Sequence, residues 1–184
     1  MADNMLTPIF RAGFISVFKP SKPNGSNQDP KYSIRAMFPP NTDMSTLKAA
    51  AAQAAKDKWG ANVPKVLRSP FRKNEDLENP VPGIGDDWIV MTFSAPADKR
   101  PGLVDAKLQD IIDEVEVYSG AWYRAQVRPF AYEQQGNKGV SFGLQNVQKI
   151  KDDDPLGAGR TPANKAFDAV DVPAGSGDAG SLFD

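Results

Sequence analysis

Cysteine and histidine are both absent from the 184 residues of this chain. Without cysteine no disulfide can form, and without thiolate or imidazole ligands a zinc site is not expected. The absence of histidine also excludes the most frequent general base and the triads built on it. An enzyme of this composition would have to rely on carboxylates, for example with magnesium. We expect a protein with no cofactor and no resident metal.

Long apolar segments are absent as well. No run of apolar residues approaches the 18 or so that a membrane-spanning helix needs. Residues 1–10 lack the basic region and apolar stretch of a secretory leader. The sequence therefore predicts neither a membrane anchor nor secretion.

Charge is present in nearly equal amounts of each sign but is unevenly distributed. Residues 151–184 hold three basic and seven acidic side chains, a net charge of −4, whereas residues 1–150 hold 19 and 16, a net charge of +3. We predict a folded domain over 1–150 and a flexible acidic tail over 151–184. A basic body with an acidic arm suggests nucleic-acid binding, although a merely solubilising tail is the alternative.

The distribution of strand-forming residues predicts a mainly β fold with one Ala-rich helix. The helix is expected over 43–59, after N-cap candidates at 41–43 and before a stop at Gly60. A long loop is expected over 63–87, a short helix or turn over 107–116, and a hairpin turn over 133–137. Strands are expected over 8–18, 32–38, 88–95, 118–132 and 138–151. Five strands and one inserted helix fit a five-stranded Greek-key barrel, for which the OB-fold is the obvious candidate.

The strand over 118–132 carries the main candidate binding face. Strand alternation places small apolar residues on one face and interleaves aromatic rings with guanidinium groups on the other. Unpaired bases stack on such rings, and arginines contact the phosphates, so this face predicts single-stranded nucleic-acid binding. The alternative is that the rings fill the core, which a bulge near Pro129 would produce. With basic and aromatic residues elsewhere, the predicted DNA-binding set is Arg11, Lys19, Arg35, Phe71, Arg72, Lys73, Trp122, Arg124, Arg128, Phe130, Tyr132 and Lys138.

A second hypothesis comes from a cluster of carboxylates. Acidic residues recur between Asp105 and Glu116, namely Asp105, Asp110, Asp113, Glu114 and Glu116. Such groups hold magnesium in nucleases, so a magnesium-dependent DNA nuclease or resolvase is the alternative function.

Several segments make the chain recognisable. They are 118–125 (YSGAWYRA), 128–132 (RPFAY), 136–144 (GNKGVSFGL) and 154–157 (DPLG), together with 99–102 (KRPG) and the helix ending at Trp59. In these segments the chain resembles a bacteriophage family of single-stranded-DNA-binding proteins that was formerly a domain of unknown function. The resemblance implies an OB-fold and a non-enzymatic protein that binds single-stranded DNA during replication or recombination in the host cell cytoplasm. It leaves open whether duplex DNA or RNA also binds, and whether the protein is a homodimer.

The C-terminal residues are similar to the acidic tails of replicative single-strand binders. The resemblance implies that the tip docks onto a phage DNA polymerase, helicase or recombinase. Because seven carboxylates are tethered close to the folded body, we also expect the tail to compete with DNA for the basic groove. In this chain the final residue is Asp rather than Phe, and the aromatic residue stands one position earlier. The implied partner-binding residues are Asp178, Leu182, Phe183 and Asp184.

Overall fold

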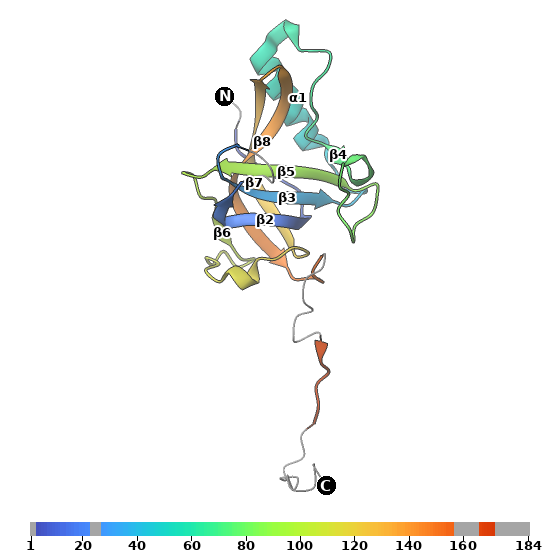
Figure 1. The fold of residues 1–184 in the computed structure, drawn as a ribbon, viewed down its shortest axis with the longest axis vertical. Helices are drawn as coiled ribbons and strands as arrows, with labels where there is room; N and C mark the ends of the chain where they lie inside the picture. The colour runs from blue at the N-terminus through green and yellow to red at the C-terminus, as the bar shows by residue number, and fades with distance from the viewer. Residues whose placement is uncertain (1–2, 23–26, 157–165, 172–184) are drawn as a thin grey trace.

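The computed structural model describes residues 3–22, 27–156 and 166–171 (Figure 1). It contains one α-helix, α1 (Ser45–Trp59), and three single-turn 3₁₀ helices, Gly60–Asn62, Asn74–Asp76 and Glu114–Glu116. Its strands are β1 (Met5–Leu6), β2 (Phe10–Ser21), β3 (Lys31–Phe38), β4 (Arg72–Lys73), β5 (Ile89–Pro96), β6 (Gly102–Val104), β7 (Trp122–Gln134) and β8 (Asn137–Lys151). Within the described residues, no helix has both the length and the apolar character needed to cross a bilayer.

Five strands close into a barrel. The order is β2, β3, β5, β8 and β7, and β7 pairs again with β2. All of these pairs are antiparallel except β5 with β8. The short strands β1, β6 and β4 extend the edges of β7, β8 and β5. This order confirms the mainly β, OB-fold-like barrel expected from the sequence.

The barrel core follows from alternation along each strand. In β3 the residues Tyr32, Ile34, Ala36 and Phe38 are buried, as the pattern predicted. The rings of four strands meet inside: Phe10, Phe93, Phe142 and Tyr123 form edge or stacked contacts with one another, and Phe38 packs against Phe10. Burying each of these side chains contributes about 1.5–3 kcal/mol. The core therefore fixes which side chains of each strand face outward.

Helix α1 covers one side of this barrel next to the β7–β8 hairpin (Figure 1). It begins two residues later than predicted, because Asp43 stays outside and its carboxylate accepts a hydrogen bond from the Ser45 backbone N–H at 3.0 Å. It ends at Gly60, whose φ of 57° is the left-handed conformation that glycine adopts readily. Leu47 and the alanines 51, 54 and 55 are the buried face.

Two segments, 63–87 and the hairpin turn, differ from the sequence expectations, whereas 107–116 agrees with them. Residues 63–87 are not only a loop: they contain β4, and the buried Asn74 amide forms two hydrogen bonds with the Val81 backbone. Residues 107–116 form turns and a 3₁₀ helix. The hairpin turn is only Gln135–Gly136, with φ values of 51° and 79°, because a two-residue turn with left-handed backbone matches the twist of the strands.

Candidate nucleic-acid interface

The outward face of β7 is the one that alternation predicted. Tyr123, Ala125 and Val127 are buried, whereas Arg128 and Phe130 are exposed. A register shift occurs at Gln126/Val127, but the extra residue lies on β8, so the alternation of β7 continues through Pro129. The alternative in which a bulge turns the rings into the core is wrong for Phe130, which is 44% exposed.

Outward-facing residues of five neighbouring strands form two rows that run across the sheet. The strand registers align the first row as Phe130, Ser141, Thr92, Arg35 and Gly13. They align the second row as Arg128, Gly143, Ser94, Ser33 and Ser16. Between β7 and Arg35 the rows contain only serine, threonine and glycine. Hollows open beside Thr92 and Ser141 of the first row and beside Ser94 and Gly143 of the second, and we call the two rows together the trough.

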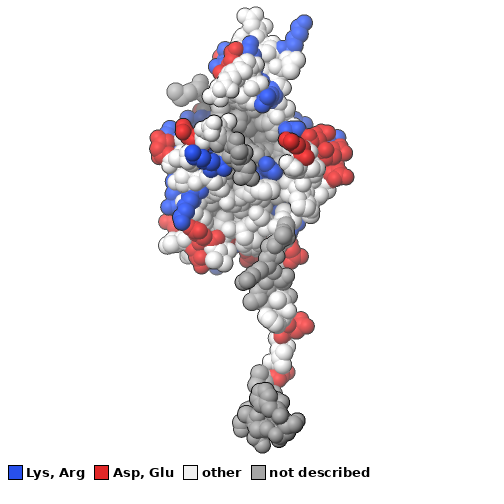
Figure 2. Space-filling view, viewed as in Figure 1, with Lys and Arg blue, Asp and Glu red and all other residues white. Residues whose placement is uncertain are grey.

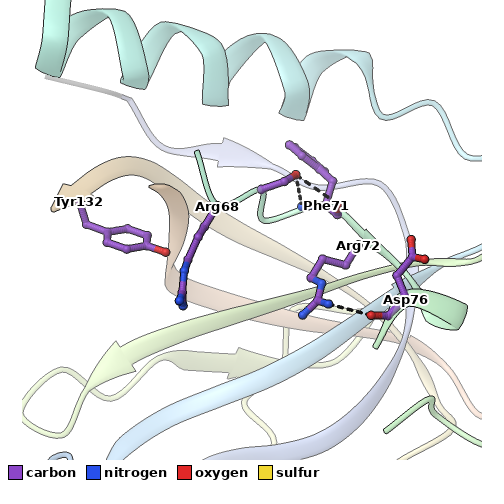
Figure 3. Close-up of a pocket in the computed structure, with 6 residues that line it drawn as sticks. Arg68, Phe71, Arg72, Asp76 and Tyr132 are labelled. Atoms are coloured by element: carbon purple, nitrogen blue, oxygen red, sulfur yellow. Dashed lines mark hydrogen bonds between the residues drawn. The ribbon is translucent and has the colours of Figure 1, made fainter. Parts of the chain in front are cut away.

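Three hollows border the trough. One of about 660 Å³ is lined by Arg68, Ser69, Phe71, Arg72, Asp76 and Tyr132 (Figure 3). A smaller one of about 260 Å³ shares Arg72 and Tyr132 with it and reaches Arg35, Thr92 and Ser141 in the first row. A third, of about 610 Å³, lies beside Phe130 and Gly143 and includes Lys31 and Ser94. The cavities on both sides of the trough therefore contain a ring and at least one cation, together with the carboxylates Asp76 on one side and Asp29 and Asp98 on the other.

The loop segment 68–72 forms one wall of the trough. It is attached to β8, because the Arg68 N–H donates to the Lys138 carbonyl at 2.8 Å. Arg68 and Arg72 point away from α1 and over the strands, whereas Phe71 points toward α1 (Figure 3). Arg72 also donates to the Asp76 carbonyl at 2.8 Å. Phe71 makes an edge contact with the buried Phe142 ring, so its half-buried ring belongs largely to the core side of the segment.

Two glycines of β8 make room for the rings of β7. A Cβ on Gly139 would lie 2.7 Å from the Tyr132 hydroxyl oxygen, and one on Gly143 would lie 3.9 Å from the Phe130 ring. The two rings are 6.4 Å apart at 55°. Tyr132 thus lies against a position where any side chain larger than that of glycine would force a neighbouring group to shift, whereas Gly143 leaves ordinary contact distance to Phe130.

A Gly139→Ala substitution is expected to lower the free energy of unfolding by about 1–3 kcal/mol, the usual cost of overpacking. The added methyl group would meet both Tyr132 and the Arg68 carbonyl oxygen within 3.0 Å. Chemical denaturation measures the change. Gly143→Ala is the matched control, because its Cβ meets only ordinary contacts of 3.6 Å or more. Equal stability of the two variants would contradict a close contact between position 139 and the Tyr132 side chain.

Arg35 is the cation near the β2 end of the first row of the trough. Its guanidinium carbon lies 4.5 Å from the centre of the Phe14 ring. Burial lowers the pKa of Arg35 from its usual value, because a low-dielectric environment disfavours the charged form. No carboxylate within the described ranges forms a salt bridge with it. The charge is therefore partly desolvated and compensated mainly by an aromatic ring.

Phe14 was missed by the sequence analysis. Unbroken alternation from Phe10 and Ala12 would turn Phe14 into the core. A one-residue bulge between Gly13 and Ser16 turns it outward instead, where it is 63% exposed. No residue type in the sequence announces this bulge, although Gly13 marks a place where the strand can deform.

Trp122 and Arg11 lie at the other end of β7, where they bind the residues that follow β8. The Trp122 indole N–H donates to the Asp153 carboxylate at 2.7 Å, and Lys151 lies over its ring. Arg11 donates to the Asp154 carbonyl at 2.7 Å and to the Gly120 carbonyl at 2.8 Å. These contacts hold residues 152–156 on the barrel, and we call them the junction.

The remaining predicted residues are spread around the barrel. Arg124 donates to the Gln148 side chain at 2.6 Å, and Arg128 donates to Asn4 at 3.1 Å. Lys138 pairs with Glu133 at 3.4 Å and Lys73 with Glu75 at 3.8 Å. Lys19 is exposed on β2. The predicted tail residues Asp178, Leu182, Phe183 and Asp184 lie outside the described residues.

Two of the five carboxylates between Asp105 and Glu116 stabilise local turns. Asp105 accepts hydrogen bonds from the backbone N–H groups of Lys107 and Gln109 at 2.8 and 3.0 Å. Asp113 accepts one from Val115 at 3.0 Å. Short acidic side chains commonly stabilise turns in this way. Asp110, Glu114 and Glu116 are exposed on the same loop.

Charge on the face that shows β2, β3 and β5 is mixed. In Figure 2 the middle of this face is mostly uncharged, with basic side chains scattered around it and acidic ones gathered toward the margins. A ligand on this face would contact a few individual Lys and Arg side chains rather than a continuous basic patch.

One protein-family model and one curated protein match most of this chain. The model of the Enterobacter phage Enc34 ssDNA-binding protein family matches residues 4–176. A putative protein, p50, of Acyrthosiphon pisum secondary endosymbiont phage 1 is 26% identical over 173 residues, covering 88% of this chain and 91% of that protein.

Two solved structures share the fold. The single-stranded DNA-binding protein of bacteriophage Enc34 in complex with ssDNA superposes with a TM-score of 0.67 at 22% identity, covering 84% of this chain and 89% of that one. The single-stranded DNA-binding protein gp2.5 of bacteriophage T7 superposes with a TM-score of 0.64 at 15% identity, covering 97% and 100%. Because the family model spans nearly the whole sequence, the chain belongs to the Enterobacter phage Enc34 ssDNA-binding protein family.

Proposed function

We propose that this protein binds single-stranded DNA in the trough. One observation carries the proposal: the strand registers align a floor of serine, threonine and glycine across the barrel, with Phe130 at one end and Arg35 near the other. A floor without large side chains lets a nucleic-acid strand approach the sheet. The family relationship supports the same ligand.

The position of the trough agrees with how OB-folds use their surface. Oligonucleotides bind such barrels on the face of the second and third strands and at the loops that join strands one to two and four to five. In this barrel those strands are β3 and β5, and the loops are the β2–β3 connection and the Gln135–Gly136 turn.

The groups in the trough and in the hollows that border it have distinct tasks in this proposal. Phe130 and Tyr132 stack on bases, a contact that tolerates any sequence because every base has an aromatic face. Arg35, Arg68 and Arg72 contact phosphates, and the serine and threonine hydroxyls donate to phosphate oxygens between them. Few cations are involved, so the affinity should be moderate. For each phosphate contact, the affinity should fall by about 0.7 logarithmic units for every tenfold increase in salt concentration.

The protein is a binder and not an enzyme, because its family is one of ssDNA-binding proteins. The nuclease hypothesis is therefore set aside. Two of the five carboxylates that suggested it, Asp105 and Asp113, accept turn-stabilising hydrogen bonds from nearby backbone N–H groups.

The chain beyond the junction has a separate role in the proposal. Because residues 152–156 are bound to the barrel, the folded body should extend to Leu156, six residues beyond the boundary expected from the sequence. The following acidic tail would recruit replication or recombination proteins through Leu182 and Phe183 in the cytoplasm of the infected host. Deleting the tail after Leu156 should abolish such recruitment while the barrel stays folded.

The proposed function is tested by fluorescence anisotropy with a labelled oligo-dT and an unlabelled duplex as competitor, at low and moderate salt. We expect salt-sensitive binding that the duplex displaces poorly. Absence of binding at low salt, for both the full chain and a chain ending at Leu156, would contradict the proposal.

A further inference from the structure

The strained backbone of Phe14 singles this residue out among the aromatic side chains of the trough face. Its φ of 47° lies in the left-handed region, which bulky side chains rarely adopt. Strain of this kind persists only where the surrounding structure enforces it, and it concentrates at functional sites. The same bulge that strains the backbone exposes 63% of an aromatic side chain to solvent.

Phe14 lies at the end of the first row opposite Phe130. The row passes from Phe130 on β7 through β8, β5 and β3, and its last member, Gly13 on β2, precedes Phe14. Four strand-to-strand steps of about 4.8 Å separate the two ends, roughly 19 Å along the sheet. Arg35 belongs to the first row and also contacts Phe14, because its guanidinium group lies over the Phe14 ring.

From this arrangement, and resting on the proposed function, we infer that Phe14 is a second base-stacking platform and that bound single-stranded DNA crosses the strands from Phe130 to Phe14. One ring at each end stacks on a base, and the DNA backbone runs over the small residues that lie between the two rings. Arg35 stands beside the second platform, where it meets the phosphate next to the stacked base. Bulges often turn a side chain toward a binding site in this way.

Substitution of Phe14 separates the ring from the backbone strain. With an oligo-dT of about 16 nucleotides, Phe14→Ala and Phe14→Gly should both weaken binding about 5- to 150-fold, the range seen when a stacking ring is removed. Phe14→Gly should also raise Tm, because glycine adopts a positive φ without strain. Phe14→Tyr should bind like the unchanged protein. Loss of affinity together with gain of stability is a combination that a purely structural residue would not give.

The chain supplies a matched control. Leu108 is also exposed, at 72%, and also has a positive φ, of 65°, but it lines none of the hollows around the trough. Leu108→Gly should raise Tm while leaving the affinity for oligo-dT unchanged.

Photo-crosslinking gives the direct readout. An oligo-dT that contains iodouracil should crosslink to peptides containing Phe14 as well as Phe130. Wild-type affinity of Phe14→Ala, or crosslinks confined to the Phe130 peptide, would overturn the inference. The proposed function would then still stand if Phe130→Ala weakens binding. Failure of the unchanged protein to bind oligo-dT would overturn both.

Discussion

Replacing Phe130 and Tyr132 together with alanine should weaken binding to oligo-dT by about 2–4 kcal/mol, or about 30- to 1000-fold. Each stacked base contributes about 1–3 kcal/mol, and we expect less than the full sum because the two rings touch each other. The effect should be similar for oligonucleotides of different base composition, since stacking does not read base edges. Anisotropy titration measures the loss.

The fold should survive this double substitution. Phe130 is 44% exposed and both rings lie on the outside of the barrel, so little core packing is removed. Val115→Ala is the control: this side chain is 80% exposed but lines a different hollow, beside Tyr118 and Lys149. Unchanged affinity of the double variant, with an unchanged circular-dichroism spectrum, would show that the β7 rings do not contact DNA.

Arg35→Gln should weaken binding by about 1.5–3 kcal/mol, or about 10- to 150-fold, through loss of a charge-assisted hydrogen bond to phosphate. The slope of log affinity against log salt should become shallower by about 0.7, the value for one phosphate contact on a single strand. Titrations at several salt concentrations give both numbers.

Stability should respond differently from affinity in this variant. Burial lowers the pKa of Arg35, so the folded barrel holds this charge at a cost that glutamine removes. The contact with Phe14 is lost at the same time, at about 0.5–1 kcal/mol. The two effects oppose each other, and we expect a change in the free energy of unfolding below about 1 kcal/mol. Lys107→Gln, in the hollow beside Val115, is the control for removal of one charge. A salt slope that is identical for Arg35→Gln and the unchanged protein would contradict a phosphate contact.

Period-two alternation explains why so much of the barrel could be predicted. Tyr32 to Phe38 and Trp122 to Phe130 alternate between an inward and an outward face, as predicted. Met37 is the exception in its burial, because this residue of the outer face of β3 packs in a second small core with Val81 and Val90. The helix was equally clear, because an alanine-rich run stops at Gly60. Local periodicity and stop signals are encoded within a few residues of one another, so they can be read without tertiary information.

The trough depends on information that local patterns do not contain. Ser33, Ser94 and Gly143 are unremarkable within their own strands, and they form a floor only because the register aligns them. The outward turn of Phe14 depends on a one-residue bulge, and the assignment of Trp122 depends on a carboxylate 31 residues away. Pairing between distant segments determines the floor of the trough, the orientation of Phe14 and the contact of Trp122. The sequence therefore indicated which residue types lie on the binding face, but not which of them line up across the strands.

The central claim is that single-stranded DNA occupies the trough, and amide chemical-shift mapping tests it most directly. The isotope-labelled protein would be titrated with oligo-dT and its backbone N–H resonances followed. The structure predicts the largest shifts along the two rows, at Ser33, Arg35, Thr92, Ser94, Ser141 and Gly143, with small shifts in the 105–116 loop. Shifts concentrated in that loop or on the outer face of α1, with the rows unaffected, would contradict the claim.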